Sequence, residues 1–120
     1  MNGEPILHIT SREAWTDAQK KGAYTAGSLA GEGFIHCSRP AQVLRVANAF
    51  YSGQEDLVLL VIDPQKLTAE LRWEPGVDLK SEFFPHVYGP INLEAVVDAP
   101  DFSPGPDGKF SLPPALEGLE

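Results

Sequence analysis

The sequence has little sulfur and no long apolar run. Of its 120 residues only Cys37 is a cysteine, so no disulfide forms within the chain, which fits a reducing compartment. A membrane-spanning helix needs roughly 20 consecutive apolar residues, and none are present. The N-terminus also lacks the basic start and apolar segment of a secretory signal. These absences predict a cytoplasmic protein with no membrane partner.

Basic residues are also scarce. Nine Lys and Arg stand against 17 Asp and Glu, which gives a net charge of −8. The basic residues are scattered, and no cluster is longer than the pair Lys20 and Lys21. A nucleic-acid surface gathers cations to neutralise phosphates, so a long nucleic-acid partner is disfavoured. A small anionic ligand held by one arginine stays compatible with this composition.

Two helices are expected in the first half of the chain. Thr10 and Glu13 form a capping-box pattern, which predicts a helix starting after Thr10. Gly22 is the expected left-handed terminator. Pro40 opens a second helix that runs to about Tyr51 with an apolar stripe along one face.

The strands are predicted from apolar patterning. Residues 56–63 contain an unbroken apolar run, "LVLLVI", which favours a central strand buried on both faces. The Gly- and Ala-rich residues 23–32 are expected to be a loop long enough to lie over a pocket. The Pro- and Gly-rich tail is expected either to add a short strand near "KFSL" or to fray. The other expected strands are residues 5–10, 33–38, 71–74 and 91–99.

Composition and element order together predict the fold class. A hydrophobic fraction of 42% and 22% charged residues are typical of one globular domain. Helices near the N-terminus followed by strands argue for an α+β domain rather than a doubly wound sheet. We assign residues 1–112 to this domain and 113–120 to a frayed tail, in which Leu119 and Glu120 resemble a cloning scar.

The three histidines share one local pattern. Each is followed two residues later by a hydroxyl-bearing residue, in the pairs His8–Thr10, His36–Ser38 and His86–Tyr88. Side chains two apart on a strand share a face, so each pair would point the same way. Pro85 permits an extended segment around His86 only near a sheet edge. The pattern predicts that all three histidines line one cleft.

Four interpretations of the pattern remain open. The histidines are buried neutral rings with local partners, or they hold zinc with an open fourth position. Ser38 or Cys37 is a nucleophile activated by histidine, or imidazoles and hydroxyls line a polar ligand pocket. The spacing lacks a metal-binding motif, and Ser38 lacks a nucleophile-elbow motif. We therefore favour the pocket, and we expect no metal and an inert Cys37.

Several motifs resemble a known family. In order they are "ILHIT", "EGFIHCS", "DLVLLVID", "RWE", "FPHVYGPI" and "AVV", and the resemblance spans about residues 5 to 98. This set resembles the bacterial domain-of-unknown-function family 952. "LHIT", a helix, a glycine stop and "FIHCS" also resemble the opening of RNA 2′-phosphotransferases, which have the ADP-ribosyltransferase fold. That resemblance implies two small mixed β-sheets with two helices beside them and an NAD cleft.

The implied site combines these residues with carboxylates. His8 and Thr10 match positions that contact the NAD ribose in that fold, although Ile9 stands where glycine is usual. The chain has few arginines, and no carboxylate lies in the transferase motif. The leading hypothesis is an NAD- or nucleotide-binding domain with ADP-ribosyl or phosphoryl transfer. The alternatives are a non-catalytic binding module and a histidine-based metalloenzyme. Candidate catalytic residues are His36, His86, Glu74 and Glu82; candidate ligand-binding residues are His8, Thr10, Ser38, Tyr24, Tyr88 and Arg72.

Overall fold

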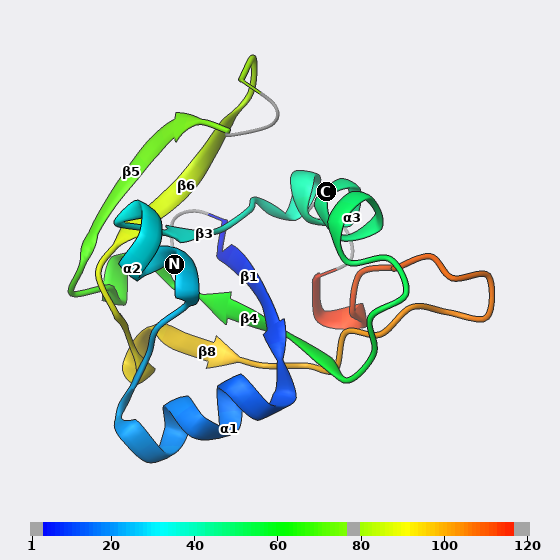
Figure 1. Ribbon diagram of the computed structural model, residues 1–120, viewed down its shortest axis with the longest axis horizontal. Helices are drawn as coiled ribbons and strands as arrows, with labels where there is room; N and C mark the ends of the chain where they lie inside the picture. Colours follow the sequence, from blue (N-terminus) through cyan, green and yellow to red (C-terminus); the bar gives the residue numbers. More distant parts are fainter. Residues whose placement is uncertain (1–3, 77–79, 117–120) are drawn as a thin grey trace.

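The strand β4 (Leu57–Ile62) is the middle strand of an antiparallel sheet, with β1 (Ile6–Ser11) on one side and β8 (Val96–Asp98) on the other. The structure is a computed structural model that describes residues 4–76 and 80–116 (Figure 1). Every residue of β4 is buried, so the expected central strand is confirmed.

Two further antiparallel sheets complete the β-structure. The strands β3 (Ile35–His36), β6 (Phe83–Tyr88) and β5 (Glu70–Pro75) form the second three-stranded sheet, in that order. β2 (Ala23–Tyr24) pairs with β7 (Ile91–Asn92). The α-helices are α1 (Arg12–Lys21), α2 (Gly27–Glu32) and α3 (Pro40–Phe50), and single turns of 3₁₀-helix lie at Pro64–Lys66, Leu93–Ala95 and Pro114–Leu116.

The α+β class is confirmed, but its expected details are corrected. The two mixed sheets implied by the transferase resemblance are wrong, because the described residues form three sheets in which all paired strands are antiparallel. Residues 23–32 are not simply a loop, since they form β2 and α2. β2 is held by pairing with the distant β7, a contact that local sequence patterning does not reveal.

The helix ends follow local sequence signals with one shift. The N-cap of α1 is Ser11, whose hydroxyl accepts a hydrogen bond from Ala14 N at 3.0 Å. The predicted cap at Thr10 is therefore wrong by one residue, because Thr10 stays in β1 and pairs with Val58. Gly22 ends the helix with φ +93°, as predicted. The start of α3 at Pro40 is also confirmed.

The sheet β1–β4–β8 separates two apolar clusters. One face of β1 and β4 packs against α1 and β2 through residues such as Ala18 and Tyr24. The other face packs against α3 through Val43 and Ala47. His8 pairs with Leu60, a residue of the first cluster. The side chain of His8 therefore points to the side where Tyr24 lies.

The C-terminal segment closes the second cluster. Phe102, Phe110, Leu112 and Leu116 are buried in it. Of the two alternatives for this tail, the short strand near "KFSL" is wrong, because residues 109–112 form no strand. Leu116 is buried in a turn of 3₁₀-helix within the segment expected to fray, and residues 117–120 lie outside the described residues.

Pro85 lies in β6, the middle strand of its sheet, and not at an edge. The carbonyl of Pro85 accepts a hydrogen bond from Cys37 N at 3.1 Å, on the side of β3. The N–H and C=O of one strand residue point to the same side. The missing N–H of Pro85 therefore faces the end of β3, where the chain turns away to pair with Leu7.

In the described part of the chain, no helix has both the length and the apolar character needed to cross a bilayer.

Candidate functional site

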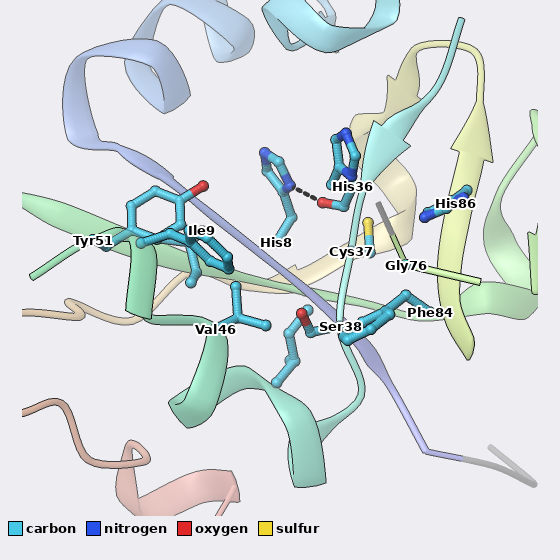
Figure 2. Close-up of a pocket in the computed structure, with 12 residues that line it drawn as sticks. His8, Ile9, His36, Cys37, Ser38, Val46, Tyr51, Gly76, Phe84 and His86 are labelled. Atoms are coloured by element: carbon cyan, nitrogen blue, oxygen red, sulfur yellow. Dashed lines mark hydrogen bonds between the residues drawn. The ribbon is translucent and has the colours of Figure 1, made fainter. Parts of the chain in front are cut away.

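All three histidines line one cavity, as the shared pattern predicts (Figure 2). The cavity has a volume of about 180 Å³ and lies between β1, β3, α3 and β6. His8 comes from β1, His36 from β3 and His86 from β6. The rings of His36 and His86 are 5.5 Å apart, because these residues pair directly across β3 and β6. Three segments far apart in the sequence therefore converge on one site.

His8 is held in a buried chain of hydrogen bonds. Its Nδ1 lies 2.6 Å from the carbonyl oxygen of His36, as the dashed line in Figure 2 shows. Its Nε2 lies 2.7 Å from the hydroxyl of Tyr24. That hydroxyl lies 2.9 Å from Thr10 Oγ1. Nδ1 of His8 therefore links β1 to β3, while Tyr24, itself bonded to Thr10, holds Nε2.

The protonation state of His8 follows from its surroundings. Burial lowers its pKa to about 4, so the ring is neutral near pH 7. A carbonyl oxygen only accepts, so Nδ1 carries the proton and donates to His36. Nε2 then accepts from the Tyr24 hydroxyl, and the Tyr24 oxygen accepts from the Thr10 hydroxyl. Both ring nitrogens of His8 and the hydroxyl of Tyr24 therefore have hydrogen-bond partners.

His36 is far more open than His8. Its side chain is 41% exposed, and its Nε2 lies 2.9 Å from Glu32 Oε1. Glu32 is the last residue of α2, four residues before His36. The side chain of Glu32 is also well exposed. The ring of His36 therefore borders the cavity with water on one side and a carboxylate on its Nε2.

His86 is buried and held by Glu74. The side chain of His86 is 3% exposed, and its Nδ1 lies 2.8 Å from Glu74 Oε1. The Tyr88 hydroxyl donates to the same oxygen at 2.6 Å. The hydrogen bonds from Tyr88 and His86 hold the pKa of the Glu74 carboxyl below its usual range, so it is an acceptor at neutral pH. Nδ1 of His86 therefore donates to Glu74, and Nε2 of this cavity-lining residue forms no hydrogen bond with another described residue.

Aromatic rings cover this cluster. Phe34 stacks on His86 with ring centroids 4.1 Å apart and touches the rings of His36 and Tyr88. The guanidinium carbon of Arg72 lies 4.4 Å above the centroid of the Tyr88 ring. Arg72 and Tyr88 line neither cavity, so they support Glu74 and His86 from outside.

A second cavity adjoins the first. It has a volume of about 380 Å³ and shares His8, Ile9, His36 and Tyr51 with the first cavity. Its remaining lining is mostly hydroxyl and amide side chains, from Thr10, Ser11, Tyr24, Ser28 and Gln54. Together the two volumes lie in the range of small-molecule sites, roughly 300–1,000 Å³. The site is therefore a two-part cleft with His8 and His36 at its middle.

The candidate carboxylate Glu82 lies elsewhere. It accepts hydrogen bonds from Arg45 at 2.6 Å and Gln42 at 2.8 Å. Both partners belong to α3, so Glu82 ties α3 to the start of β6. It lines neither cavity. The structure thus brings Glu74, and not Glu82, to the histidines.

Ser38 and Cys37 line the first cavity beside His36. Burial raises the pKa of the Cys37 thiol far above neutrality, so the thiol is not nucleophilic. Ser38 pairs through its backbone with Leu7. No described histidine nitrogen is hydrogen-bonded to Ser38 Oγ. Among residues 4–76 and 80–116, no group of three or more His, Cys, Asp or Glu is arranged to hold a metal ion.

Several residues of the site were not predicted from the sequence, among them Glu32, Phe34 and Tyr51. Glu32 is the last residue of α2 and His36 lies in β3, so their contact depends on the turn at Gly33 and no local spacing signals it. Phe34 stands two residues before His36, so strand alternation predicts a shared face. Tyr51 borders both cavities from the end of α3, and no local signal marks it.

Fold and site together describe a small α+β domain with a cleft that collects all its histidines. The profile of a family described as "Protein of unknown function (DUF952)" matches residues 9–99. The chain therefore belongs to this family, and the first resemblance is confirmed.

Solved structures agree with this assignment. The chain is similar to the crystal structure of protein CC0527 from Caulobacter crescentus, with a TM-score of 0.82, 31% identity, and coverage of 93% of this chain and 97% of that one. The solution NMR structure of the same protein matches with a TM-score of 0.74 and 31% identity, over 88% of this chain and 90% of that one. A search of curated proteins finds no match. These comparisons do not show an ADP-ribosyltransferase fold.

Proposed function

We propose that the protein binds a small nucleotide-like ligand in the two-part cleft and carries out acid–base chemistry on it. The observation that carries the proposal is the Glu74–His86 pair, whose free Nε2 belongs to a residue lining the cavity. NAD is the first candidate ligand, and ADP-ribosyl or phosphoryl transfer is the candidate reaction class.

Glu74 gives His86 a defined role in such a reaction. A carboxylate on Nδ1 fixes the tautomer and stabilises the imidazolium that forms when Nε2 takes a proton. His86 would act as the base toward a hydroxyl of the ligand or of the acceptor. His36, with its ring 5.5 Å away and open to water, would exchange the proton with solvent. His86 would thus serve as the base, and His36 would pass the proton to solvent.

The other polar residues would bind and orient the ligand. Burial keeps the His8 ring neutral, and the hydrogen bonds through Tyr24 to Thr10 hold the ring in place. A rigid polar wall loses little entropy when a ligand docks. Arg72 and Tyr88 would act through Glu74, because they do not reach the cavities.

A ligand titration followed by NMR tests the binding step. The chain has three histidines, and all line the first cavity. NAD binding should therefore move all three histidine ring signals. The indole signal of Trp73 should stay unchanged, because Trp73 is 47% exposed and lines neither cavity. Unchanged histidine signals with NAD, ADP-ribose and nucleosides alike would overturn the proposal.

Two matched carboxylate variants test the chemical role. Glu74→Gln removes the charge beside His86, whereas Glu82→Gln removes a charge outside the cleft. If a bound compound is turned over, Glu74→Gln should slow turnover about 100-fold or more, and Glu82→Gln should leave it within about threefold. Equal losses in both variants would argue for a structural effect and favour a non-catalytic binding module.

A further inference from the structure

We infer that the part of the ligand held in the cleft is a nucleoside-like ring and sugar without a phosphate. This inference rests on the proposed function and narrows its substrate class. The two cavities differ in chemistry, and each suits one half of such a molecule. His8 and His36 lie between the halves.

The lining carries no fixed charge. Among the described residues, no Lys, Arg, Asp or Glu lines either cavity. His8 stays neutral, because burial lowers its pKa to about 4. Burial also raises the pKa of Tyr24 and of Tyr51, so both keep their protons. A phosphate in this cleft would lose its hydration without gaining a permanent cation, which is costly.

The nearby arginines are committed elsewhere. Arg72 forms a two-pronged ion pair with Glu70, at 2.9 and 3.1 Å, and lies over the Tyr88 ring. Arg45 pairs with Glu82 at 2.6 Å. Arginine is the usual partner of phosphate because its fork matches phosphate oxygens. Neither arginine lines a cavity, so neither is positioned to serve a ligand phosphate inside the cleft.

The first cavity suits a planar ring. Its walls are mainly apolar side chains, and His36 and His86 contribute two aromatic rings. Phe50, 53% exposed at the end of α3, also borders it. Flat heteroaromatic rings bind between such side chains by stacking and burial. Figure 2 shows Phe84, Val46 and Tyr51 around this space.

The second cavity suits a sugar. Its lining offers the hydroxyls of Ser28 and Tyr51 and the amide of Gln54, which both donate and accept. A sugar presents the same mixed pattern in its hydroxyls. None of these three side chains forms a hydrogen bond with another described residue. They are therefore available to a ligand.

Calorimetric titration with matched ligands tests the inference. Adenosine, uridine and nicotinamide riboside are compared with their 5′-monophosphates and with NAD at fixed salt. The dissociation constant of each nucleoside should be no more than about threefold larger than that of its monophosphate. Tyr51→Phe, which keeps the ring and removes the hydroxyl, should weaken nucleoside binding about threefold to tenfold.

A charge inserted at the sugar end sharpens the test. Gln54 is exposed and lines the second cavity, so Gln54→Lys should fold normally. It should shift the preference toward monophosphates by about tenfold, the effect of one charge-assisted bond. Gln65→Lys adds the same charge at an exposed position outside both cavities and should leave the preference unchanged.

The possible results distinguish a failure of the phosphate-free inference from a failure of the proposed function. If monophosphates or NAD bind the unmodified protein at least tenfold more tightly than nucleosides, the phosphate-free inference is overturned and the proposed function stands. If neither nucleosides nor nucleotides bind, the proposed function fails and the inference falls with it. An equal gain in Gln54→Lys and Gln65→Lys would show a general charge effect and overturn the placement of the sugar.

Discussion

His36 and His86 face each other across β3 and β6, yet their surroundings differ. His86 is buried beneath Phe34 and bonded to Glu74, whereas the side chain of His36 is 41% exposed and its carboxylate partner is open to water. Substitutions should therefore show that His86 stabilises the fold, whereas His36 mainly contributes to ligand binding.

His36→Ala should cost less than about 1 kcal/mol of stability, because it removes one exposed side-chain contact with Glu32 and leaves the His36 carbonyl that His8 needs. His86→Ala should cost about 1–3 kcal/mol, because it opens a buried space and removes a partner of Glu74. Urea denaturation of both variants measures the difference. Ligand binding by His36→Ala should fall at least about tenfold. A large stability loss in His36→Ala would instead identify a core residue.

His8 should make stability depend on pH. Its pKa falls from the usual 6.5 to about 4 in the fold because of burial. The unfolded chain therefore binds the proton first, and stability present above about pH 6.5 is lost as pH falls toward 4. Between pH 7 and 5 this contributes up to about 2 kcal/mol. Urea denaturation at both pH values should show a smaller difference in His8→Asn than in the unmodified protein. An equal difference in both would refute the assignment.

At the scale of elements, the pairing of β5 with β6 builds the site. Their register sets Glu70 opposite Tyr88, Arg72 opposite His86 and Glu74 opposite Phe84, so these side chains share one face. The hairpin is closed at its base by Gly89, whose φ is +152° and whose missing side chain leaves room for Ala69.

Gly89→Ala should destabilise the protein by about 1–3 kcal/mol, because a new Cβ would lie 2.9 Å from the Cβ of Ala69 in an unfavourable backbone conformation. The matched control is Gly31→Ala in α2, where no atom lies within 4 Å of the new carbon. The control should be neutral or stabilise by up to about 1 kcal/mol. Melting temperatures of both variants test the prediction, which fails if they shift equally.

At the scale of the whole molecule, the segment after β8 completes the core. Phe110 is 5% exposed and stacks on Phe102 with centroids 4.8 Å apart. Its backbone N donates to Asn48 in α3 at 2.9 Å. Phe110→Ala should therefore cost about 3–5 kcal/mol. Phe83→Ala, at a phenylalanine 56% exposed, should cost less than about 1 kcal/mol. Calorimetric unfolding showing equal losses would contradict this role for the tail.

Local chemistry made part of the fold predictable. Gly22 ends α1 because it takes a left-handed conformation without steric cost, and Pro40 begins α3 because its fixed φ suits a first turn. The unbroken apolar run of β4 requires burial on both faces. The expected strand at residues 33–38 contains β3, although β3 is limited to Ile35–His36. The short strand β2 escaped such reasoning, because two residues carry no periodicity and β2 exists only through pairing with β7.

The candidate site was also predictable only in part from the sequence. The sequence by itself determined that His8 and His86 each share a face with the hydroxyl two residues later, since each pair lies in one strand and alternation is a property of any strand. Glu74 and Glu82 were equal candidates at that level. Only the tertiary structure separated them: the β5–β6 pairing brings Glu74 to within 2.8 Å of His86, while Arg45 of α3 holds Glu82 outside the cleft. The physical reason is that strand pairing and helix packing join residues distant in sequence, and no local pattern encodes which of two carboxylates is reached.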